Sequence, residues 1–231
     1  ERIPDKEIAL NFNAKQGGQF NVRNIDSEIA DSEVERIYKE YAAGHTSLRT
    51  GMRFDADTLV KERESIYNLM RRRGYYDYVR QYVRFEVDTN INKGQADLRL
   101  FIDNPEGKSA HTVFKIDSSY VTIKNSEEGL GDSSAAKTVL PGALVVQDYS
   151  DKFKPKPLTR YIYPKKGDLF DAERENLTYD RLYELNSFRA IRTTYKKKDS
   201  TSLTVNYELI PSKRMANRVE GEYVFSSGRS G

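Results

Sequence analysis

Two periodicities run along this chain: strict alternation of apolar and polar residues, and apolar residues that recur every three or four positions. Alternation predicts half-buried strands, and it covers residues 7–14, 20–25, 83–87, 96–102 and 203–210. Helical spacing begins at Asp31 or Ser32 and again at Asp55 or Asp57, and these helices end at Gly44 and Gly74. The first half is therefore predicted to run strand, helix, helix, strand, strand.

One short motif occurs twice. Gly51-Met52-Arg53-Phe54-Asp55-Ala56 opens one predicted helix, and Gly167-Asp168-Leu169-Phe170-Asp171-Ala172 opens another, 116 positions later. At the same offset Ile66 and Leu69 fall on Leu182 and Leu185. A repeated unit of this size favours a tandem of small domains over one large enzyme core.

The second copy departs from the first in its front half. A strand is predicted around 113–123, but residues 125–160 are rich in Ser, Gly, Ala, Lys and Pro and contain no clear first helix. We expect a surface loop there, with 139–149 as an additional short strand. The copy then resumes with a helix over 171–185 and strands over 190–195 and 203–210.

Composition narrows the functional classes. The 231 residues carry 38 basic and 35 acidic side chains, interspersed, for a net charge of +3, which gives no strong field for nucleic acid. Basic clusters stand at 71–73, 165–166 and 196–198, and they fit either solvated helix ends and turns or contact with anionic lipid head groups. There is no Cys, which excludes disulfides, thiolate metal sites and Cys nucleophiles.

Candidate catalytic residues are sparse. The two histidines, His45 and His111, fall in a predicted linker and at a unit boundary, where exposed loop histidines are expected. Asp55 and Asp171 recur at helix starts, and N-capping accounts for both. The sequence contains no nucleophile elbow, phosphate-binding loop or dinucleotide motif, so we expect no enzyme, no metal site and no cofactor.

The order strand–helix–helix–strand–strand, with Gly74-Tyr75-Tyr76 after the second helix, resembles the POTRA (polypeptide-transport-associated) domain. In the first copy the resemblance rests on Gly51, Phe54, Leu59, Arg63, Ile66, Leu69, Gly74-Tyr75-Tyr76 and the hairpin through Ile102. In the second copy it rests on Gly167-Asp168-Leu169-Phe170, Leu182, Leu185, Phe188 and the strand ending at Pro211. Asn186-Ser187-Phe188 replaces the Gly-Tyr-Tyr triplet in that copy.

The tail, Arg218–Tyr223 followed by Ser226-Ser227-Gly228, resembles the entry strand of an outer-membrane β-barrel. The whole chain is most similar to the lipoprotein TamL branch of the BamA/TamA superfamily in Bacteroidetes. This resemblance implies an α+β fold of tandem POTRA-like units, each a three-stranded mixed sheet with helices packed on one face. The implied domains are a tail of a preceding unit (1–18), a unit at 19–106, a last unit at 107–214 with an insertion at 125–160, and the first barrel strand at 215–231.

The resemblance also implies a function. Each small sheet must have open edges, and an extended peptide can join such an edge through main-chain hydrogen bonds. The family places this edge at residues 81–88 and 190–196, with Tyr82, Arg84, Glu86, Asp88, Arg192 and Thr194 as candidate partner-binding residues. The same polar side chains would also discourage aggregation, and Tyr75, Tyr76, Tyr78 and Tyr82 serve either the core or a binding surface.

The predicted protein is a non-catalytic module on the periplasmic side of the bacterial outer membrane, next to a barrel that this chain lacks. Its partners would be outer-membrane protein precursors or an envelope-spanning protein, and not nucleic acid. The alternative is a passive spacer, or a module docking one fixed partner, in a surface-antigen-type outer-membrane protein.

Overall fold

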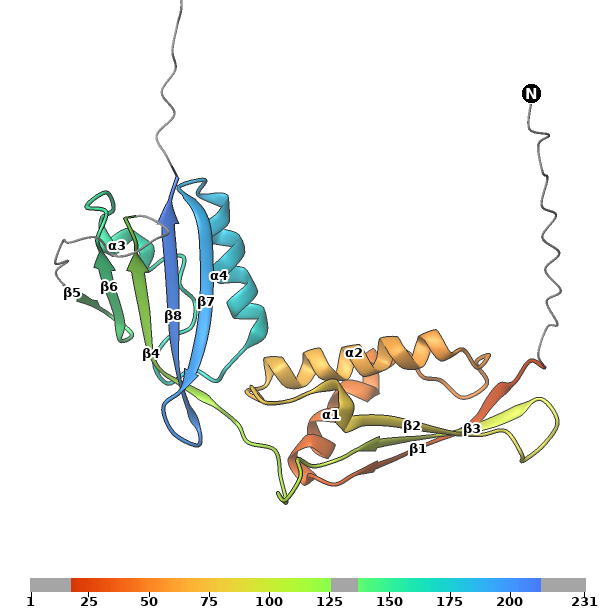
Figure 1. Ribbon diagram of the computed structural model, residues 1–231. Coiled ribbons are helices and arrows are strands. Elements are labelled where there is room, and N and C mark those ends of the chain that lie inside the picture. The colour runs from red at the N-terminus through yellow and green to blue at the C-terminus, as the bar shows by residue number, and fades with distance from the viewer. Residues whose placement is uncertain (1–17, 126–136, 213–231) are drawn as a thin grey trace, which may run out of the picture. The chain divides into compact units, whose positions relative to one another are not determined.

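The computed structural model describes residues 18–125 and 137–212, which form two compact units that divide between Val113 and Phe114 (Figure 1). The strand expected at 7–14 and the barrel-entry segment expected at 215–231 lie outside the described residues, as does the 126–136 part of the insertion. Each unit is a mixed sheet with helices on one face, so the predicted α+β fold is confirmed.

The first unit follows the predicted order of elements. Its elements are β1 (Asn21–Ile29), α1 (Ser32–His45), α2 (Ala56–Arg72), the short 3-10 helix η1 (Arg80–Tyr82), β2 (Val83–Asp88) and β3 (Gln95–Ile102). The strands lie in the order β1-β3-β2, with β1 parallel and β2 antiparallel to β3. Both edges of this sheet are therefore formed by strands that have one neighbour each.

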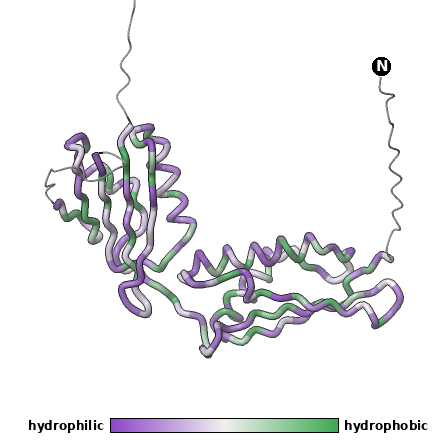
Figure 2. Tube along the Cα trace, viewed as in Figure 1, coloured by the Kyte–Doolittle hydropathy of each residue, from purple (hydrophilic) through white to green (hydrophobic). Residues whose placement is uncertain are grey.

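Alternation along the strands separates the two faces of this sheet (Figure 2). Val83, Leu100 and Ile102 point into a core with Ile37 of α1 and Ile66 of α2, each at most 4% exposed. The side chains between them in sequence face away from the helices. One face of the sheet is thus the core, and the other is open to solvent.

The second unit has the same arrangement of three strands, with two more strands added to its sheet. Its elements are β4 (Lys115–Ile123), β5 (Lys137–Leu140), β6 (Leu144–Asp148), α3 (Pro155–Leu158), α4 (Ala172–Glu184), β7 (Phe188–Lys197) and β8 (Ser202–Pro211). The order β4-β8-β7 repeats β1-β3-β2, with the same parallel and antiparallel pairings. The β5–β6 hairpin joins β4 in parallel and extends the sheet to five strands, β5-β6-β4-β8-β7.

The inserted segment therefore differs from the expected surface loop. The extra strand expected at 139–149 is present as β6, but it is one arm of a hairpin whose turn contains Gly142 and Ala143, both with positive φ. In the chain order, the four-residue α3 stands where the first unit has the fourteen-residue α1. Leu158 of α3 and Ile162 after it are buried, so this segment completes the core that a full helix covers in the first unit.

The repeated Gly-x-x-Phe-Asp motif forms the same hydrogen bonds in both units. In the first unit the Gly51 amide donates to the Val22 carbonyl (2.7 Å), the Val22 amide to Met52 (2.8 Å), and the Phe54 amide to Phe20 (2.8 Å). The next residue, Asp55, accepts a bond from the Asp57 amide and caps α2. These three main-chain hydrogen bonds, called the clip below, hold the loop before α2 against the start of β1.

The second unit repeats this clip. The Gly167 amide donates to Ile116 (2.8 Å), the Ile116 amide to Asp168 (2.8 Å), and the Phe170 amide to Phe114 (2.9 Å). Asp171 caps α4 through the amides of Glu173 and Arg174, as the sequence predicts. Gly51 and Gly167 have φ of 85° and 91°, a conformation that suits glycine, which explains why this residue recurs.

Replacing the clip glycine tests this account. A Cβ on Gly51 would meet no atom within 4 Å, so Gly51→Ala acts through its left-handed backbone and should destabilise the first unit by about 1–2 kcal/mol. Gly44→Ala, in helix α1 and equally unobstructed, should instead stabilise it by about 0.5–1 kcal/mol. Urea unfolding of the two variants measures both changes in the free energy of unfolding. Equal changes of the same sign would contradict the role of Gly51 in the clip.

Candidate functional site

The strands that follow the second helix of each unit, β2 and β7, are edge strands. Each has a single neighbour, β3 or β8, and its other side carries no further strand among the described residues. An edge strand turns alternate main-chain groups toward its neighbour and the remaining ones outward. Which residues face outward decides what an incoming strand would touch.

In β2 the outward main-chain groups belong to the core-facing residues. The Asp103 amide donates to the Tyr82 carbonyl at 2.9 Å, which makes Tyr82–Asp103 a hydrogen-bonded pair of the ladder. Alternation from this pair, with Val83 opposite Ile102, leaves Val83, Phe85 and Val87 with outward N–H and C=O groups.

A side chain closes one end of this edge. The Arg63 guanidinium of α2 donates through Nε to the Val83 carbonyl at 3.0 Å. That contact confirms that the Val83 carbonyl points away from β3. The free stretch of the edge is therefore centred on Phe85 and Val87.

The same alternation holds in β7. The Lys198 amide donates to the Ser202 carbonyl at 2.9 Å, and Lys197 lies opposite Leu203. Counting back along the ladder leaves four residues whose main-chain groups point away from β8: Ile191, Thr193, Tyr195 and Lys197. Both units thus offer the edge of the equivalent strand.

The predicted site residues lie on the solvent face next to these edges. Arg84, Glu86 and Asp88 are exposed on β2, and their main-chain groups belong to the pairs that face β3. Arg84 bonds Asp103 at 2.8 Å and stacks over the Phe101 ring at 4.5 Å. Their side chains would flank an added strand, and the sequence reasoning missed the residues whose main chain would bind it.

Charged side chains tie this open face together across its strands. Glu86 and Asp88 border a shallow hollow of about 220 Å³ that also includes Asp26, Asp97, Leu98 and Arg99. Arg23, at the bulge of β1, binds both carboxylate oxygens of Asp97 and holds the pKa of that carboxyl below its usual range.

The β7 candidates have a similar setting. Arg192 and Thr194 are exposed, and Arg192 lies 3.7 Å from Glu208, which also binds Lys124 at 2.9 Å. A hollow of about 400 Å³ beside the strand is lined by Lys124, Ala190, Ile191, Arg192, Glu208 and Ile210. The structure therefore brings Arg192 next to one of the outward-facing edge residues, Ile191.

Tyr82 differs from the expectation of an outward-facing strand residue. It ends η1, before β2, and its ring packs against Tyr78 (5.5 Å between ring centroids) and His111 (4.9 Å). Tyr75 and Tyr78 complete this cluster and are each 2% exposed. The tyrosines after the second helix thus serve mainly the core, one of the two roles that the sequence left open.

His111 is half-buried in this tyrosine cluster, contrary to the expected exposed loop position. Its Nε2–H donates to the Asp103 carbonyl at 3.1 Å, and its amide donates to the Asp31 carboxylate at 2.7 Å. Asp31 is also the N-cap of α1, so one carboxylate holds both a helix start and the 103–112 segment. Burial lowers the pKa of His111 and raises the pKa of Tyr75 to about 12.

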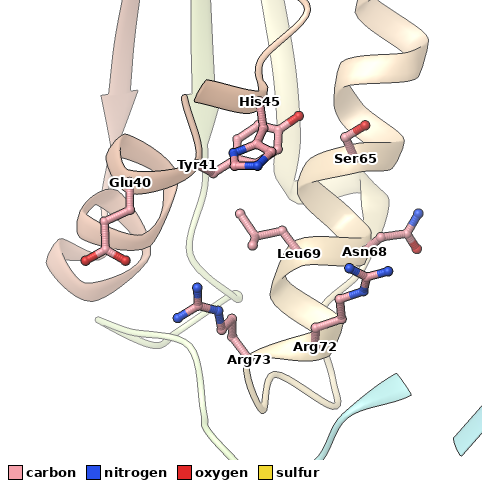
Figure 3. Close-up of a pocket in the computed structure, with 8 residues that line it drawn as sticks. All are labelled: Glu40, Tyr41, His45, Ser65, Asn68, Leu69, Arg72 and Arg73. Carbon is pink, nitrogen blue, oxygen red and sulfur yellow. The ribbon is translucent and has the colours of Figure 1, made fainter. Parts of the chain in front are cut away.

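A groove of about 450 Å³ runs between α1 and α2 (Figure 3). Glu40, Tyr41 and His45 line it from α1, and Ser65, Asn68, Leu69, Arg72 and Arg73 from α2. His45 is the last residue of α1 and not part of a linker, and it stacks on Tyr41 at 5.9 Å. Ser65 of α2 and Tyr41 of α1 face this groove together, and burial raises the pKa of Tyr41.

Residues 18–125 and 137–212 contain no group of three or more His, Asp or Glu that could hold a metal ion. Within the same residues, no helix is long and apolar enough to cross a membrane. Glu62, fully buried, accepts bonds from the Thr46 hydroxyl and from the amide and hydroxyl of Ser47, so its place is structural.

Comparison with solved structures identifies this architecture. The BamA structure from Haemophilus ducreyi that lacks POTRA domains 1–3 aligns with 84% of this chain at a TM-score of 0.58 and 12% identity. The chain has the fold of tandem POTRA domains. It spans 30% of that BamA chain, so the likeness concerns the fold and not the whole protein's activity.

Two further solved structures align with the chain at lower TM-scores. POTRA domains 3–5 of BamA from Haemophilus influenzae align with 83% of the chain at 12% identity and a TM-score of 0.46, and this chain covers 61% of that structure. CdiB from Acinetobacter baumannii aligns with 87% of the chain at 13% identity and a TM-score of 0.32, with 31% of CdiB covered. No protein-family model and no curated protein sequence matches the chain.

The half-buried His111 makes the stability of the first unit depend on pH. Because its pKa is lower in the folded state, His111 binds a proton less readily there than in the unfolded chain. Stability should be highest above about pH 6.5 and fall as the pH drops from there toward 5.5, by at most about 1.4 kcal/mol per pH unit.

Urea unfolding at pH 7.5 and 5.5 measures this loss. His111→Gln should flatten the dependence across that window. His45→Gln, at the exposed end of α1, is the matched control and should leave the dependence intact, and an unchanged slope in His111→Gln would contradict the burial argument.

Proposed function

We propose that this chain is a module of an outer-membrane assembly or translocation protein that holds extended outer-membrane polypeptides by adding them as a strand to β2 or β7. The observation that carries the proposal is the pair of equivalent open edges. Phe85 and Val87 in one unit, and Ile191 and Thr193 in the other, turn main-chain N–H and C=O groups outward. A strand bound through these groups is recognised whatever its side-chain sequence.

The opposite side of each sheet supports this choice of edge. In the first unit the clip occupies the outer N–H and C=O of Val22, at the start of β1. In the second unit the clip occupies Ile116 in the same way, and β6 then pairs with β4 from Ser119 to Ile123. The strand after the second helix is thus the open edge that both units share.

The side chains around these edges suit a temporary guest. Arg84, Glu86, Asp88, Arg192 and Thr194 place charged or polar groups beside the outward main chain. Such side chains discourage two edges from pairing with each other while leaving the main chain accessible. The affinity expected from main-chain bonds alone is modest, as release of a client requires.

The setting of this module follows from the same proposal. It would act on the periplasmic side of the outer membrane, with the segment at 215–231 leading into a barrel and the segment at 1–18 belonging to a preceding unit. Its partners would be outer-membrane protein precursors or an envelope-spanning protein, and its role would be non-catalytic. Membership of the TamL branch stays a prediction from the sequence motifs.

Proline substitution at an outward-facing amide tests strand addition. Val87→Pro removes one outward N–H and no bond to β3, and should weaken binding of a barrel-strand peptide at least about fivefold, the equivalent of one hydrogen bond. Val87→Thr keeps the amide and a similar shape, so its affinity should be unchanged. Amide-shift titration gives both affinities and reports whether the fold is retained.

The second unit offers an independent pair, Thr193→Pro against Thr193→Val. Peptide-induced shifts that avoid 83–88 and 188–197, or equal affinities in the proline and control variants, would overturn strand addition. A passive spacer predicts no shifts at all in any of these proteins. Docking of one fixed partner instead predicts binding that depends on the peptide's side-chain sequence.

A further inference from the structure

Basic charge is concentrated in the segment that sets the second unit apart. Residues 137–166 hold seven basic and two acidic residues, a net charge of +5, although the whole chain nets +3 and the rest of it therefore −2. The seven cations are all exposed: Lys137, Lys152, Lys154, Lys156, Arg160, Lys165 and Lys166. None of them forms an ion pair within residues 18–125 and 137–212.

The acidic residues of the segment do not neutralise this charge. The Asp148 carboxylate accepts bonds from the amides of Ser150 (2.8 Å), Lys152 (3.0 Å) and Phe153 (2.8 Å). It is therefore committed to the turn after β6. Asp151 is exposed, and it is the remaining acidic residue of a segment that holds seven cations.

An apolar cavity lies within the same segment, between the β5–β6 hairpin and α3. Its volume is about 260 Å³, and its apolar lining includes Leu140, Leu144, Ile162 and Pro164. Leu144 and Ile162 are 5% and 3% exposed, so the floor belongs to the packed core. Lys156 and Lys165 also line the cavity.

Lys165 is held in place by the hairpin turn. A Cβ at Gly142 would lie 3.4–3.5 Å from three carbons of the Lys165 side chain, so the lysine stem runs closely over this glycine. The Lys166 amide also donates to the Gly142 carbonyl at 3.1 Å. The ammonium group thus extends from a positioned stem beside an apolar cavity.

We propose that this cavity and its lysines bind an anionic phospholipid of a membrane surface. Part of an acyl chain would enter the apolar cavity, and Lys156 and Lys165 would bind the phosphate. Burial of acyl methylene groups in an apolar cavity is favourable, and the lysines beside it add attraction for the phosphate. The other five cations of the segment add to the attraction for an anionic surface.

The residue types favour a lipid over an acidic protein. Six of the seven cations are lysines, which bind phosphate as compact point charges. Protein interfaces are instead enriched in arginine and depleted in lysine. The sheet order places the β5–β6 hairpin at the edge opposite β7, so this site is independent of strand addition.

Vesicle co-sedimentation of the full 231-residue chain tests the proposal. The chain should bind vesicles of phosphatidylcholine that contain about 30% phosphatidylglycerol, which gives an anionic surface. It should not bind vesicles of pure phosphatidylcholine. Lys156→Gln with Lys165→Gln should lower partitioning about 25-fold, since each basic residue near such a surface contributes about fivefold. Lys61→Gln with Lys93→Gln removes the same charge from the first unit and is the matched control.

Equal loss in the two double variants would overturn the site, because it would reduce the effect to net charge. Equal binding to the two kinds of vesicle would overturn the role of the lysines. Binding of an acidic peptide with no binding to vesicles would also reject the lipid in favour of a protein partner.

Amide-shift titration separates the lipid from a free phosphate. Dihexanoyl phosphatidylglycerol below its micelle concentration should shift the amides of residues 140–165, and Leu140→Ser should reduce these shifts without removing the lysines. Inorganic phosphate should leave the apolar lining residues unshifted. Matching shifts from phosphate alone would show a simple anion site and contradict the acyl-chain contact.

Discussion

The clip between the Gly-x-x-Phe-Asp loop and the first strand is the constraint on which each unit depends. Three main-chain hydrogen bonds tie the loop to β1 or β4, and the Asp at the end of the motif starts the helix that covers the sheet. One short segment therefore fixes the beginning of the first strand and the start of the helix. Glycine is required because the turn needs a positive φ, at Gly51 and Gly167 alike.

The strand after the second helix has one neighbour in each unit. On the opposite side, the clip bonds the start of the first strand in both units, and β6 pairs with the rest of β4 in the second unit. Arg63 shortens this open edge. It is one of the residues on which the POTRA resemblance rests, and its guanidinium donates to the outward carbonyl of Val83. The open edge is thus short and bounded, which limits aggregation while leaving Phe85 and Val87 accessible.

The sequence predicted the elements whose periodicity is long and regular. It placed α1, α2 and α4 and the strands β2, β3 and β8, because burial on one face imposes a 2.0 or 3.6 period. It named Asp171 as a cap and left two candidates for each of the other two caps, of which the structure has Asp31 and Asp55. It named side chains beside the edge, such as Arg84 and Arg192, but not the main chain of Phe85 or Ile191. Side-chain alternation does not reveal which main-chain groups bond the neighbouring strand; that depends on the hydrogen-bonded pairs in the register.

Two other features needed the folded chain. His111 carries no apolar pattern, and its burial arises from Asp31, eighty positions earlier, and from tyrosines of another segment. The β5–β6 hairpin has strands of four and five residues, too short for alternation to distinguish them from a loop. Yet this hairpin extends the sheet, and together with the α3 segment it encloses an apolar cavity that Lys156 and Lys165 also line. The two units therefore share one scaffold and one open edge, and they differ in the layer that the scaffold leaves free to vary.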